Sequence, residues 1–222
     1  MFRRIVKIFL YGFLLSVVYI IFCRWVNPPV TLTEMVSLFS GNGFHHTYVN
    51  MDEISPNMKL AVMAGEDQLF PDHDGFDFRS IQLAIKHNQK SKSLRGASTI
   101  SQQVAKNVFL WQHGGYFRKG LEVYFTFMIE KIWNKKRILE MYLNVAQTGK
   151  GIFGVEAASE HYFQKHARDL SRKEAAQIAS CLPNPVEFTI RPMSAHVAQR
   201  YPWILKQMDN LETDPDIRAL LH

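Results

Sequence analysis

The sequence predicts a mostly α-helical domain carried on a single N-terminal membrane helix. An uncharged apolar run, Ile8 to Cys23, is long enough with its flanks to cross a bilayer. In most of the remaining chain, apolar residues recur three and four positions apart, which is typical of helices that bury one face. Residues that cap helices, such as Ser55 and Ser171, precede several of these stretches. The sequence has no strand-rich region and no internal repeat, so we expect about eight helices after the anchor.

Composition and charge limit the fold and the partners. The chain has 222 residues, of which 47% are apolar and 21% charged, so it forms a globular domain with a core rather than a disordered chain. Its net charge of +6 permits attraction to anions but does not distinguish among nucleic acid, anionic lipid and phosphate-bearing substrates. The two cysteines, Cys23 and Cys181, form no metal or redox pattern.

The N-terminal segment, residues 1–26, predicts an uncleaved membrane anchor. If Lys7 and Arg24 snorkel, the apolar span reaches the ~20 residues that cross a bilayer. The alternative is a cleaved signal peptide, but no small-x-small cleavage site follows the run. The basic residues before the run place the N-terminus in the cytoplasm and the rest of the chain on the far side of the membrane.

Residues 27–48 predict a linker and a juxtamembrane segment. The Asn-Pro-Pro sequence at 27–29 marks the linker. Residues 31–39 then form a short amphipathic helix, whose apolar face either rests on the membrane surface or packs in the core, because periodicity does not separate the two. His45 and His46 point to opposite faces of an extended segment and have no third ligand at a useful spacing, so we expect no metal there.

The domain from residue 49 to 211 is expected to consist of helices joined by polar loops. The polar and basic stretch 86–96 is interpreted as a solvated loop or as a flexible cationic edge beside an anionic ligand. The tail, residues 212–222, is expected to be loosely packed. The expected helices are Pro56 to Glu66, Phe78 to Asn88, a helix capped by Ser98 that runs to Leu110, Phe117 to Trp133, Lys135 to Val145, Val155 to Phe163, Arg172 to Cys181 and Ala195 to Leu211.

Glu66 and Asp67 are candidate functional residues because they are carboxylates at the end of an apolar helix. A carboxylate at a helix C-terminus faces the negative end of the helix dipole, which is locally unfavourable, and breaks of local rules are candidates for function. The alternative is a solvated helix end, and these two residues alone do not decide between the readings.

Two further polar clusters have the same ambiguity. One is a stripe at helical spacing, which is either a solvent-exposed face or the wall of a polar cleft. The stripe consists of Thr99, Gln102, Gln103 and Lys106. In the other, Arg118 and Lys119 precede Glu122 by one helical turn, and this spacing alone favours an ordinary surface ion pair worth ~0.3–0.5 kcal/mol.

Five blocks of the sequence, in order, resemble the motifs of the family 51 glycosyltransferases, the peptidoglycan polymerases. The first three blocks are Glu-Asp-x-x-Phe-x-x-His-x-Gly-x-Asp at 66–77, Gly-Ala-Ser-Thr-Ile-Ser-Gln-Gln-x-x-Lys-Asn at 96–107 and Arg-Lys-x-x-Glu at 118–122. The fourth and fifth are Lys-x-x-Ile-Leu-Glu-x-Tyr-Leu-Asn at 135–144 and the looser Arg-x-x-x-Ile-Leu at 200–205. The resemblance covers residues 49–211, and five blocks in order at sensible spacing make chance a poor explanation.

Residues 149–159 and 182–185 resemble the monofunctional members of this family, and too little chain follows the fifth block for a transpeptidase domain. The chain departs from the pattern at Gln147 and Thr148, where we expect Glu and Phe in close relatives. The resemblance implies a lysozyme-like helical fold with a large lobe and a small membrane-associated jaw lobe. It also implies a location in the inner membrane, with the catalytic domain in the periplasm.

The resemblance implies a reaction as well. Such enzymes join disaccharide-pentapeptide units that are carried on undecaprenyl diphosphate. The growing glycan is the donor, lipid II is the acceptor through its GlcNAc 4-hydroxyl, and the MurNAc anomeric carbon is inverted to a β-1,4 bond as the lipid diphosphate leaves. By resemblance, Glu66 is the base that takes the hydroxyl proton and Glu122 is the second carboxylate. We expect the helix end and Asp67 to raise the pKa of Glu66.

The other residues of these blocks receive roles by resemblance. Those expected to bind the sugar or the diphosphate are Lys119, Arg118, Ser98, Thr99, Gln102, Gln103, Lys106, Asn107, Lys135 and Arg137. Those expected to support the geometry are Asp67, Phe70, His73, Gly75, Asp77, Glu140 and Asn144. No metal site is expected and no cofactor is required, although a divalent cation, Mg²⁺ or Mn²⁺, could assist the diphosphate.

Two other functions compete with polymerisation. A lysozyme-like lytic enzyme would also need an acidic residue beside a sugar cleft, and a membrane-tethered scaffold for cell-wall proteins would need no catalytic residue. The anchor and the basic cluster favour the polymerase, because they suit a lipid-linked donor with a diphosphate leaving group. Expected partners are lipid II, the growing glycan on undecaprenyl diphosphate, inner-membrane lipid and proteins of cell division or cell-wall synthesis, but not nucleic acid.

Overall fold

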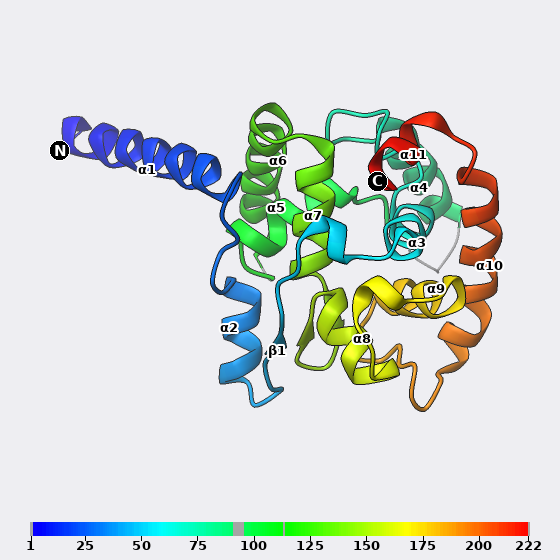
Figure 1. The fold of residues 1–222 in the computed structure, drawn as a ribbon. Coiled ribbons are helices and arrows are strands. Elements are labelled where there is room, and N and C mark those ends of the chain that lie inside the picture. Colours follow the sequence, from blue (N-terminus) through cyan, green and yellow to red (C-terminus); the bar gives the residue numbers. More distant parts are fainter. Residues whose placement is uncertain (1, 91–95, 113, 222) are drawn as a thin grey trace.

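Most of the chain is helical in the computed structural model, which describes residues 2–90, 96–112 and 114–221 (Figure 1). The first helix, α1, Phe2–Cys23, extends away from the body formed by the other helices. It contains a span of 21 residues, Arg3–Cys23, that is apolar enough to cross a membrane. A helix of this length reaches about 32 Å, close to the thickness of the hydrocarbon core of a bilayer. The predicted mostly α-helical fold is confirmed, and α1 is compatible with a single-pass membrane anchor.

The inner end of α1 is attached to the helical body. Ile20 and Cys23 are fully buried. The indole Nε1 of Trp133 donates to the carbonyl of Ile20 at 2.9 Å, and Arg137 donates to the carbonyl of Cys23 from Nε at 3.2 Å and from Nη2 at 2.8 Å. Because the last carbonyls of a helix have no partner within the helix, these two donors cap α1.

The short helix α2, Leu32–Phe39, packs on the body by one face only. Its N-terminus is closed by a capping box between Thr31 and Glu34. Glu34 is fully buried, and its Oε1 lies 2.7 Å from Nδ1 of His46. On the other face, apolar side chains such as Phe39 are exposed. The amphipathic helix expected here is therefore present, and its buried charged residue, Glu34, pairs with a histidine.

The remaining helices form the body of the molecule. They are α3 (Pro56–Glu66), α4 (Phe78–Lys90), α5 (Ile100–Phe109), α6 (Gly115–Ile132), α7 (Lys135–Val145), α8 (Val155–Phe163), α9 (Arg172–Cys181), α10 (Ala195–Leu211) and α11 (Pro215–Leu221), with 3₁₀ turns at Met51–Glu53 and Ala167–Asp169. α3 packs against α9 and α10, and α5 packs against α6 and α7. All side chains from Met58 to Ala64 in α3 are buried, so α3 runs through the core and delivers its last residue, Glu66, from the interior.

A small sheet joins three short strands, β1 (His45–His46), β2 (Gln147–Gly149) and β3 (Ile152–Phe153). The order is β1-β3-β2, with β1 parallel and β2 antiparallel to β3. Gly151 in the β2–β3 turn has a φ of +68°, and a Cβ there would lie 2.2 Å from the carbonyl oxygen of Asn42. Glycine is therefore required at this turn. These strands were not predicted, because two or three residues are too few to show an alternating pattern.

The C-terminal tail is not loosely packed, so that expectation was wrong. Residues 215–221 form α11, whose Ile217, Leu220 and Leu221 side chains are buried. The ammonium group of Lys59, a buried residue of α3, donates to the carbonyl of Leu221 at 2.8 Å. The apolar residues of the tail are too few for a clear helical period, but a buried donor on a distant helix holds its end.

Candidate active site

Glu66 lies at the C-terminal end of α3 and is half-buried as a whole residue. Ser55 caps the start of α3 by accepting from the amide of Asn57 at 3.2 Å, as expected for a serine before proline. The Nε2 of Gln103 donates to Oε2 of Glu66 at 2.8 Å, and the hydroxyl of Tyr142 donates to Oε1 of Gln103 at 3.2 Å. Tyr142 therefore orients the Gln103 amide so that its NH₂ group faces the carboxylate.

Burial raises the pKa of Glu66, and three neighbours oppose this rise. The hydrogen bond from Gln103 and the positive charges of Arg200 and Lys106 favour the ionised carboxylate, whereas the charge of Asp67 adds to the rise. The expected direction of the pKa shift is confirmed. Its main cause is the loss of water around the carboxylate, however, and Asp67 contributes less than burial does.

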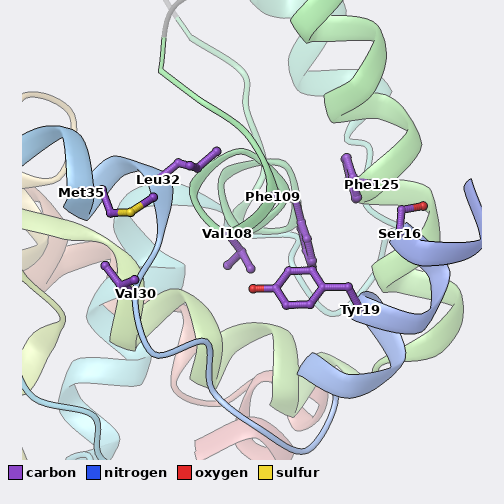
Figure 2. A pocket seen from close by; sticks show the side chains of 8 residues that line it. All are labelled: Ser16, Tyr19, Val30, Leu32, Met35, Val108, Phe109 and Phe125. Carbon is purple, nitrogen blue, oxygen red and sulfur yellow. The ribbon is translucent and has the colours of Figure 1, made fainter. Parts of the chain in front are cut away.

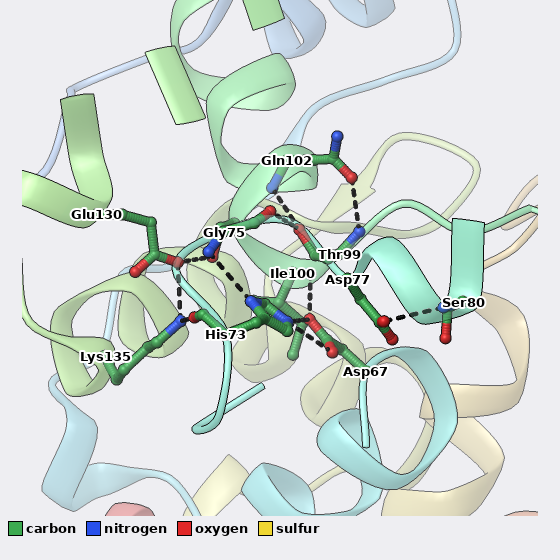
Figure 3. A network of polar contacts seen from close by, with 11 residues as sticks. Asp67, His73, Gly75, Asp77, Ser80, Thr99, Ile100, Gln102, Glu130 and Lys135 are labelled. Carbon is green, nitrogen blue, oxygen red and sulfur yellow. Dashed lines mark hydrogen bonds and ion pairs between the residues drawn. The ribbon is translucent and has the colours of Figure 1, made fainter. Parts of the chain in front are cut away.

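Asp67 and His73 hold together the loop that follows Glu66 (Figure 3). The carboxylate of Asp67 accepts from Nε2 of His73 at 3.0 and 3.1 Å and from the amide of Ile100 at 2.9 Å. The amide of Gly75 donates to Nδ1 of His73 at 3.1 Å, which fixes the proton of the neutral ring on Nε2. These contacts bind the loop to the start of α5, so both residues position the neighbourhood of Glu66.

Gly75 is required by both its backbone and its surroundings. Its φ is +88°, and a Cβ would lie 2.8 Å from Cγ2 of Thr126 and 2.9 Å from Cγ of Glu130. Its carbonyl accepts from the hydroxyl of Thr99 at 2.7 Å. Asp77 then caps α4 by accepting from the amide of Ser80 at 2.9 Å.

Lys135 braces the same loop from α7. Its ammonium group lies 2.8 Å from Oε1 of Glu130 and also donates to the carbonyl of His73 (Figure 3). It sits 4.6 Å from the ring centre of Phe70, which is fully buried. Ser101 donates to the same carboxylate of Glu130. In this arrangement Lys135 already has partners, and its closest contacts are with the loop.

The second block of the sequence contains residues that cap the N-terminus of α5 and residues that face a cavity. Thr99, not Ser98, caps α5: its hydroxyl accepts from the amide of Gln102 at 3.2 Å, and Gln102 Oε1 accepts from the amide of Thr99 at 3.1 Å. Ser98 is exposed, so the expected cap is displaced by one residue. Thr99 and Gln102 are thereby used in the capping box, and Gln103, Lys106 and Asn107 remain for the cavity.

This polar cavity has a volume of about 280 Å³ and lies beside Gln103, the partner of Glu66. It is lined largely by amide and hydroxyl groups from four parts of the chain. The polar groups that line it come from Thr33, Gln103, Lys106, Asn107, Gln112, Tyr142, Gln147 and Asn184. The Nε2 of Gln112 donates to Thr33 at 2.6 Å and to Asn107 at 3.2 Å. Thr33, Gln112, Tyr142 and Asn184 were not predicted as site residues, because only the fold brings them together.

Lys106 lies in the electric field of both acidic residues of the site. Burial lowers its pKa, and the charges of Arg118 and Lys119 lower it further, whereas Glu122 and Glu66 raise it. The structure therefore brings Glu66 and Glu122, which are separated by 56 positions in the sequence, within electrostatic reach of one lysine.

Glu122 is not part of an ordinary surface ion pair. Its side chain is only 4% exposed, and its Oε2 lies 2.7 Å from Nη1 of Arg118. Lys119 pairs with the other carboxylate oxygen, and 45% of the lysine side chain remains exposed. A buried carboxylate with two cations costs more to form than a solvated pair, so this cluster is a better candidate for function than its spacing suggested.

The structure does not bring Arg137, Glu140 or Asn144 to Glu66. Arg137, expected in the cationic donor cleft, instead caps α1 and pairs with Glu140 at 2.9 Å. Glu140 also accepts from the amide of Met51 at 3.2 Å. Asn144 exchanges two hydrogen bonds with the backbone of Val49, at 2.9 and 3.0 Å. Glu140 and Asn144 thus attach the segment before α3 to α7.

Arg200 belongs to the site, although only its place in the fifth block indicated it. Its Nη2 donates to the carbonyl of Gly65 at 3.1 Å, and its guanidinium lies 3.9 Å from the ring centre of Trp203. Its charge favours the ionised form of Glu66. α10 therefore contributes a cation at the end of α3.

One group of side chains within the described residues could hold a metal ion, and it contains neither Glu66 nor Glu122. Glu156, Glu160 and His166 have possible ligand atoms within 4.8 Å of one another. The oxygens of Glu156 are already used, however, by Nδ1 of His166 and by the amide of Ala167, each at 2.7 Å. The contacts present are those that attach α8 to the following 3₁₀ turn.

Comparison with known proteins places this arrangement in a family. A family model described as Transglycosylase matches residues 33–209. A biosynthetic peptidoglycan transglycosylase of Pseudomonas syringae pv. syringae is 45% identical over 224 residues, covering 98% of this chain and 95% of the relative. Proteins of the same name from Mannheimia succiniciproducens and Yersinia pseudotuberculosis are 51% and 58% identical, covering 81% and 75% of this chain and 74% and 70% of the relatives. With matches of this extent, the chain belongs to the transglycosylase family and is a glycosyltransferase enzyme.

Proposed function

We propose that this enzyme polymerises lipid II into β-1,4-linked glycan strands and releases undecaprenyl diphosphate. The observation that carries the proposal is that Glu66 and Glu122 both act electrostatically on Lys106. Glu66 combines partial exposure with a raised pKa, and Glu122 is buried between two cations. A base beside a cationic cluster suits the removal of a hydroxyl proton and the departure of a diphosphate. The name shared by the three relatives supports peptidoglycan as the product.

In the proposed mechanism, the Glu66 carboxylate takes the proton of the acceptor's GlcNAc 4-hydroxyl as that oxygen attacks the anomeric carbon of the donor MurNAc. The bond from this carbon to the diphosphate oxygen breaks, and its electron pair leaves with the diphosphate. Attack from the face opposite the leaving group converts the α-linkage to a β-linkage. The raised pKa of Glu66 makes it a stronger base than an ordinary glutamate.

The cations of the site are proposed to hold the leaving diphosphate. Arg118 offers a planar fork for two oxygens, and Lys119 offers a mobile point charge with an exposed side chain. Glu122 holds both cations in place, so we assign it to positioning the donor side rather than to proton transfer. Lys106, whose pKa both carboxylates raise, is proposed as the third cation that stabilises the developing charge.

We further propose that α1 spans the cell inner membrane, with the N-terminus in the cytoplasm and the catalytic body in the periplasm. The basic residues Arg3, Arg4 and Lys7 precede the longest apolar part of α1, and basic residues of this kind are retained on the cytoplasmic side. A lipid-linked substrate would then reach the cleft from the outer leaflet of the same membrane.

The first prediction compares Glu66→Gln and Glu122→Gln with the wild type on lipid II in detergent. In Glu66→Gln the new amide side chain keeps the shape of the carboxylate but cannot accept the proton, so we expect glycan synthesis to fall by about 10²–10⁴-fold. Loss of the Glu122 carboxylate frees Arg118 and Lys119, and we expect a loss of about 10²-fold from their misplacement. Product length is measured by gel electrophoresis.

Glu160→Gln is the matched control, because Glu160 is an exposed glutamate outside the cleft. It should polymerise like the wild type. Normal turnover by a folded Glu66→Gln variant would overturn the assignment of the base. A parallel incubation with purified cell wall tests the rival function: shortening of existing glycan, without synthesis from lipid II, would indicate a lytic enzyme.

A further inference from the structure

Glu130 is a buried carboxylate that lies outside the five sequence blocks and that the mechanism proposed above does not use. It belongs to α6, between the Arg-Lys-x-x-Glu block and the block that begins at Lys135. Its side chain is only 5% exposed. Burial of a carboxylate is costly unless a charge and hydrogen bonds compensate for it, so the partners of Glu130 indicate what this residue does.

One oxygen of Glu130 connects α6 to two other helices. Oε1 lies 2.8 Å from Nζ of Lys135, at the start of α7 (Figure 3). The same oxygen accepts from the hydroxyl of Ser101, a fully buried residue in the first turn of α5. Two positions further along α5 lies Gln103, whose amide donates to Glu66. Glu130 therefore contacts the turn of α5 from which the partner of Glu66 projects.

Glu130 also contacts the loop that follows Glu66. Lys135 pairs with Glu130 and donates to the carbonyl of His73 in this loop. Gly75 lies so close to the same side chain that a Cβ would be 2.9 Å from Cγ of Glu130. The loop is therefore held by α6 and α7 at these two residues, in addition to its contacts with α5 described above.

The carboxylate of Glu130 lies on the same face of α6 as the carboxylate of Glu122. Glu122, Thr126 and Glu130 are spaced four positions apart, and residues at this spacing are neighbours on a helix. At one end of this face, Glu122 holds Arg118 and Lys119. At the other end, Glu130 holds the loop through Lys135. Eight residues of α-helix span about 12 Å, so α6 sets the spacing between these two groups.

α6 is itself held in place by its neighbours. Phe125 stacks on Phe109 of α5 with ring centroids 4.8 Å apart, beside the pocket shown in Figure 2. Tyr19 of α1 meets the ring of Phe109 edge-on at 5.7 Å. Trp133, which directly follows α6, is buried and donates to the carbonyl of Ile20 at 2.9 Å. Groups carried by a packed helix are placed more precisely than groups carried by loops.

We propose that Glu130 is a positioning residue, which fixes the loop after Glu66 at a set distance from the cations held by Glu122. The inference rests on the proposed function, in which the base and the leaving-group site act on one pair of substrates. A buried ion pair is weak evidence for stability, because other side chains of similar size often serve the fold equally well. In this role, the ion pair and its hydrogen bonds define one arrangement of the loop.

The test is a double-mutant cycle on the full-length protein with lipid II in detergent. Glu130→Gln keeps the shape of the side chain without its charge, and Lys135→Met keeps the length of the side chain without the contact to His73. We expect each variant to lower kcat by about 10–100-fold, with KM within about twofold. The double variant should be no slower than Lys135→Met, because both residues act through one contact. Losses that multiply would show that the two residues act separately and would overturn the proposal.

Hydrogen exchange and Tm separate positioning from general stability. In the double variant, amides of the loop such as that of Gly75 should exchange about tenfold faster than in the wild type. Its Tm should stay close to that of the wild type, because a neutral pair replaces a buried ion pair. A reduced kcat without faster exchange in the loop, or faster exchange with an unchanged kcat, would overturn the proposal. If the double variant does not fold, Glu130→Asp, which keeps the charge on a shorter side chain, replaces it.

Glu174→Gln is the matched control, because it breaks a lysine–glutamate pair outside the cleft, between Glu174 in α9 and Lys165. It should keep the kcat and the loop exchange of the wild type. Polymerisation by the wild type with an unchanged kcat in Glu130→Gln would reject the role of Glu130 and leave the proposed function intact. Faster loop exchange in the variants, with no polymerisation by the wild type, would reject the proposed function instead.

Discussion

At the scale of single residues, the chemistry of the site depends on how the charge of Glu66 is balanced. Burial disfavours its ionised form, and Gln103, Arg200 and Lys106 favour it. The net result is a raised pKa for the carboxyl group of a residue that is not fully buried. Because Tyr142 holds Gln103 in one orientation, the balance depends on residues from α3, α5, α7 and α10 together.

The raised pKa predicts the acid limb of the pH profile. A base must be ionised to work, so kcat/KM should fall as the pH drops through the pKa of Glu66, which lies above the ~4.3 of an ordinary glutamate. Gln103→Met removes a hydrogen bond that lowers this pKa, and we expect the midpoint of the acid limb to move to higher pH.

Gln68→Met serves as the control for this measurement. Gln68 donates to the carbonyl of Ala64 at 3.1 Å and to Gln207 at 3.3 Å, so it makes no contact with the carboxylate. Its acid limb should coincide with that of the wild type. An unchanged midpoint in Gln103→Met would show that a different group controls the acid limb.

The raised pKa of Glu66 also predicts that the folded protein loses stability as the pH rises. A carboxyl group whose pKa is higher in the folded than in the unfolded state stabilises the fold below its unfolded pKa, and this contribution is lost as the pH rises through the folded pKa. Glu66→Gln does not titrate, so its Tm relative to the wild type should increase between about pH 4 and pH 7. Calorimetry in detergent across this range measures the difference, and a constant difference would contradict the prediction.

At the scale of elements, the ends of several helices position or attach the groups described above. α3 ends at Glu66, α5 begins at a capping box beside the Asp67 loop, and α1 ends at donors from the body. Arg137 shows that a residue expected in the donor cleft can instead serve a helix end. Its sequence neighbours resemble a motif, but its guanidinium points to the carbonyl of Cys23, which is 114 positions away in the sequence.

Arg137→Ala tests this assignment. Loss of a charged hydrogen-bond donor to the carbonyl of Cys23 is expected to lower the free energy of unfolding by ~1.5–3 kcal/mol. If Arg137 only caps α1, the variant should keep kcat/KM for lipid II within about threefold at a temperature where it is folded, since no group in the cleft is lost.

The matched control for this variant is Lys136→Ala, which removes one positive charge at the neighbouring exposed position. Its Tm should stay close to that of the wild type. A loss of turnover of about a hundredfold in a folded Arg137→Ala protein would return Arg137 to the cleft.

At the scale of the whole molecule, the sequence predicted what depends on local pattern. Long amphipathic stretches and their caps predicted the helices of the body, and the apolar run predicted α1. The Ser98 cap was misplaced by one residue, because serine and threonine are both good caps and only the backbone decides between Ser98 and Thr99. The strands and α11 were missed, because their stability comes from partners far away in the sequence, such as Lys59 for Leu221.

The same distinction between local pattern and distant packing applies to the candidate site. Glu66 and Glu122 could be identified from blocks of the sequence, and their shared effect on Lys106 could not, because that effect depends on the packing of α3, α5 and α6. Thr33 and Gln112 carry no pattern of their own. Thr33 lies in α2, whose buried Glu34 pairs with His46, and Gln112, which follows α5, donates to Thr33.

The way α1 joins the body has a mechanical consequence. Three contacts from separate positions, at Ser16, Ile20 and Cys23, fasten the last turns of this helix to α6, to the residue that follows α6 and to α7. If α1 spans the bilayer as we propose, these contacts link the tilt of α1 to the tilt of the helical body. The orientation of α1 would then determine how far Glu66 lies from the lipid surface and in which direction the proposed glycan product leaves.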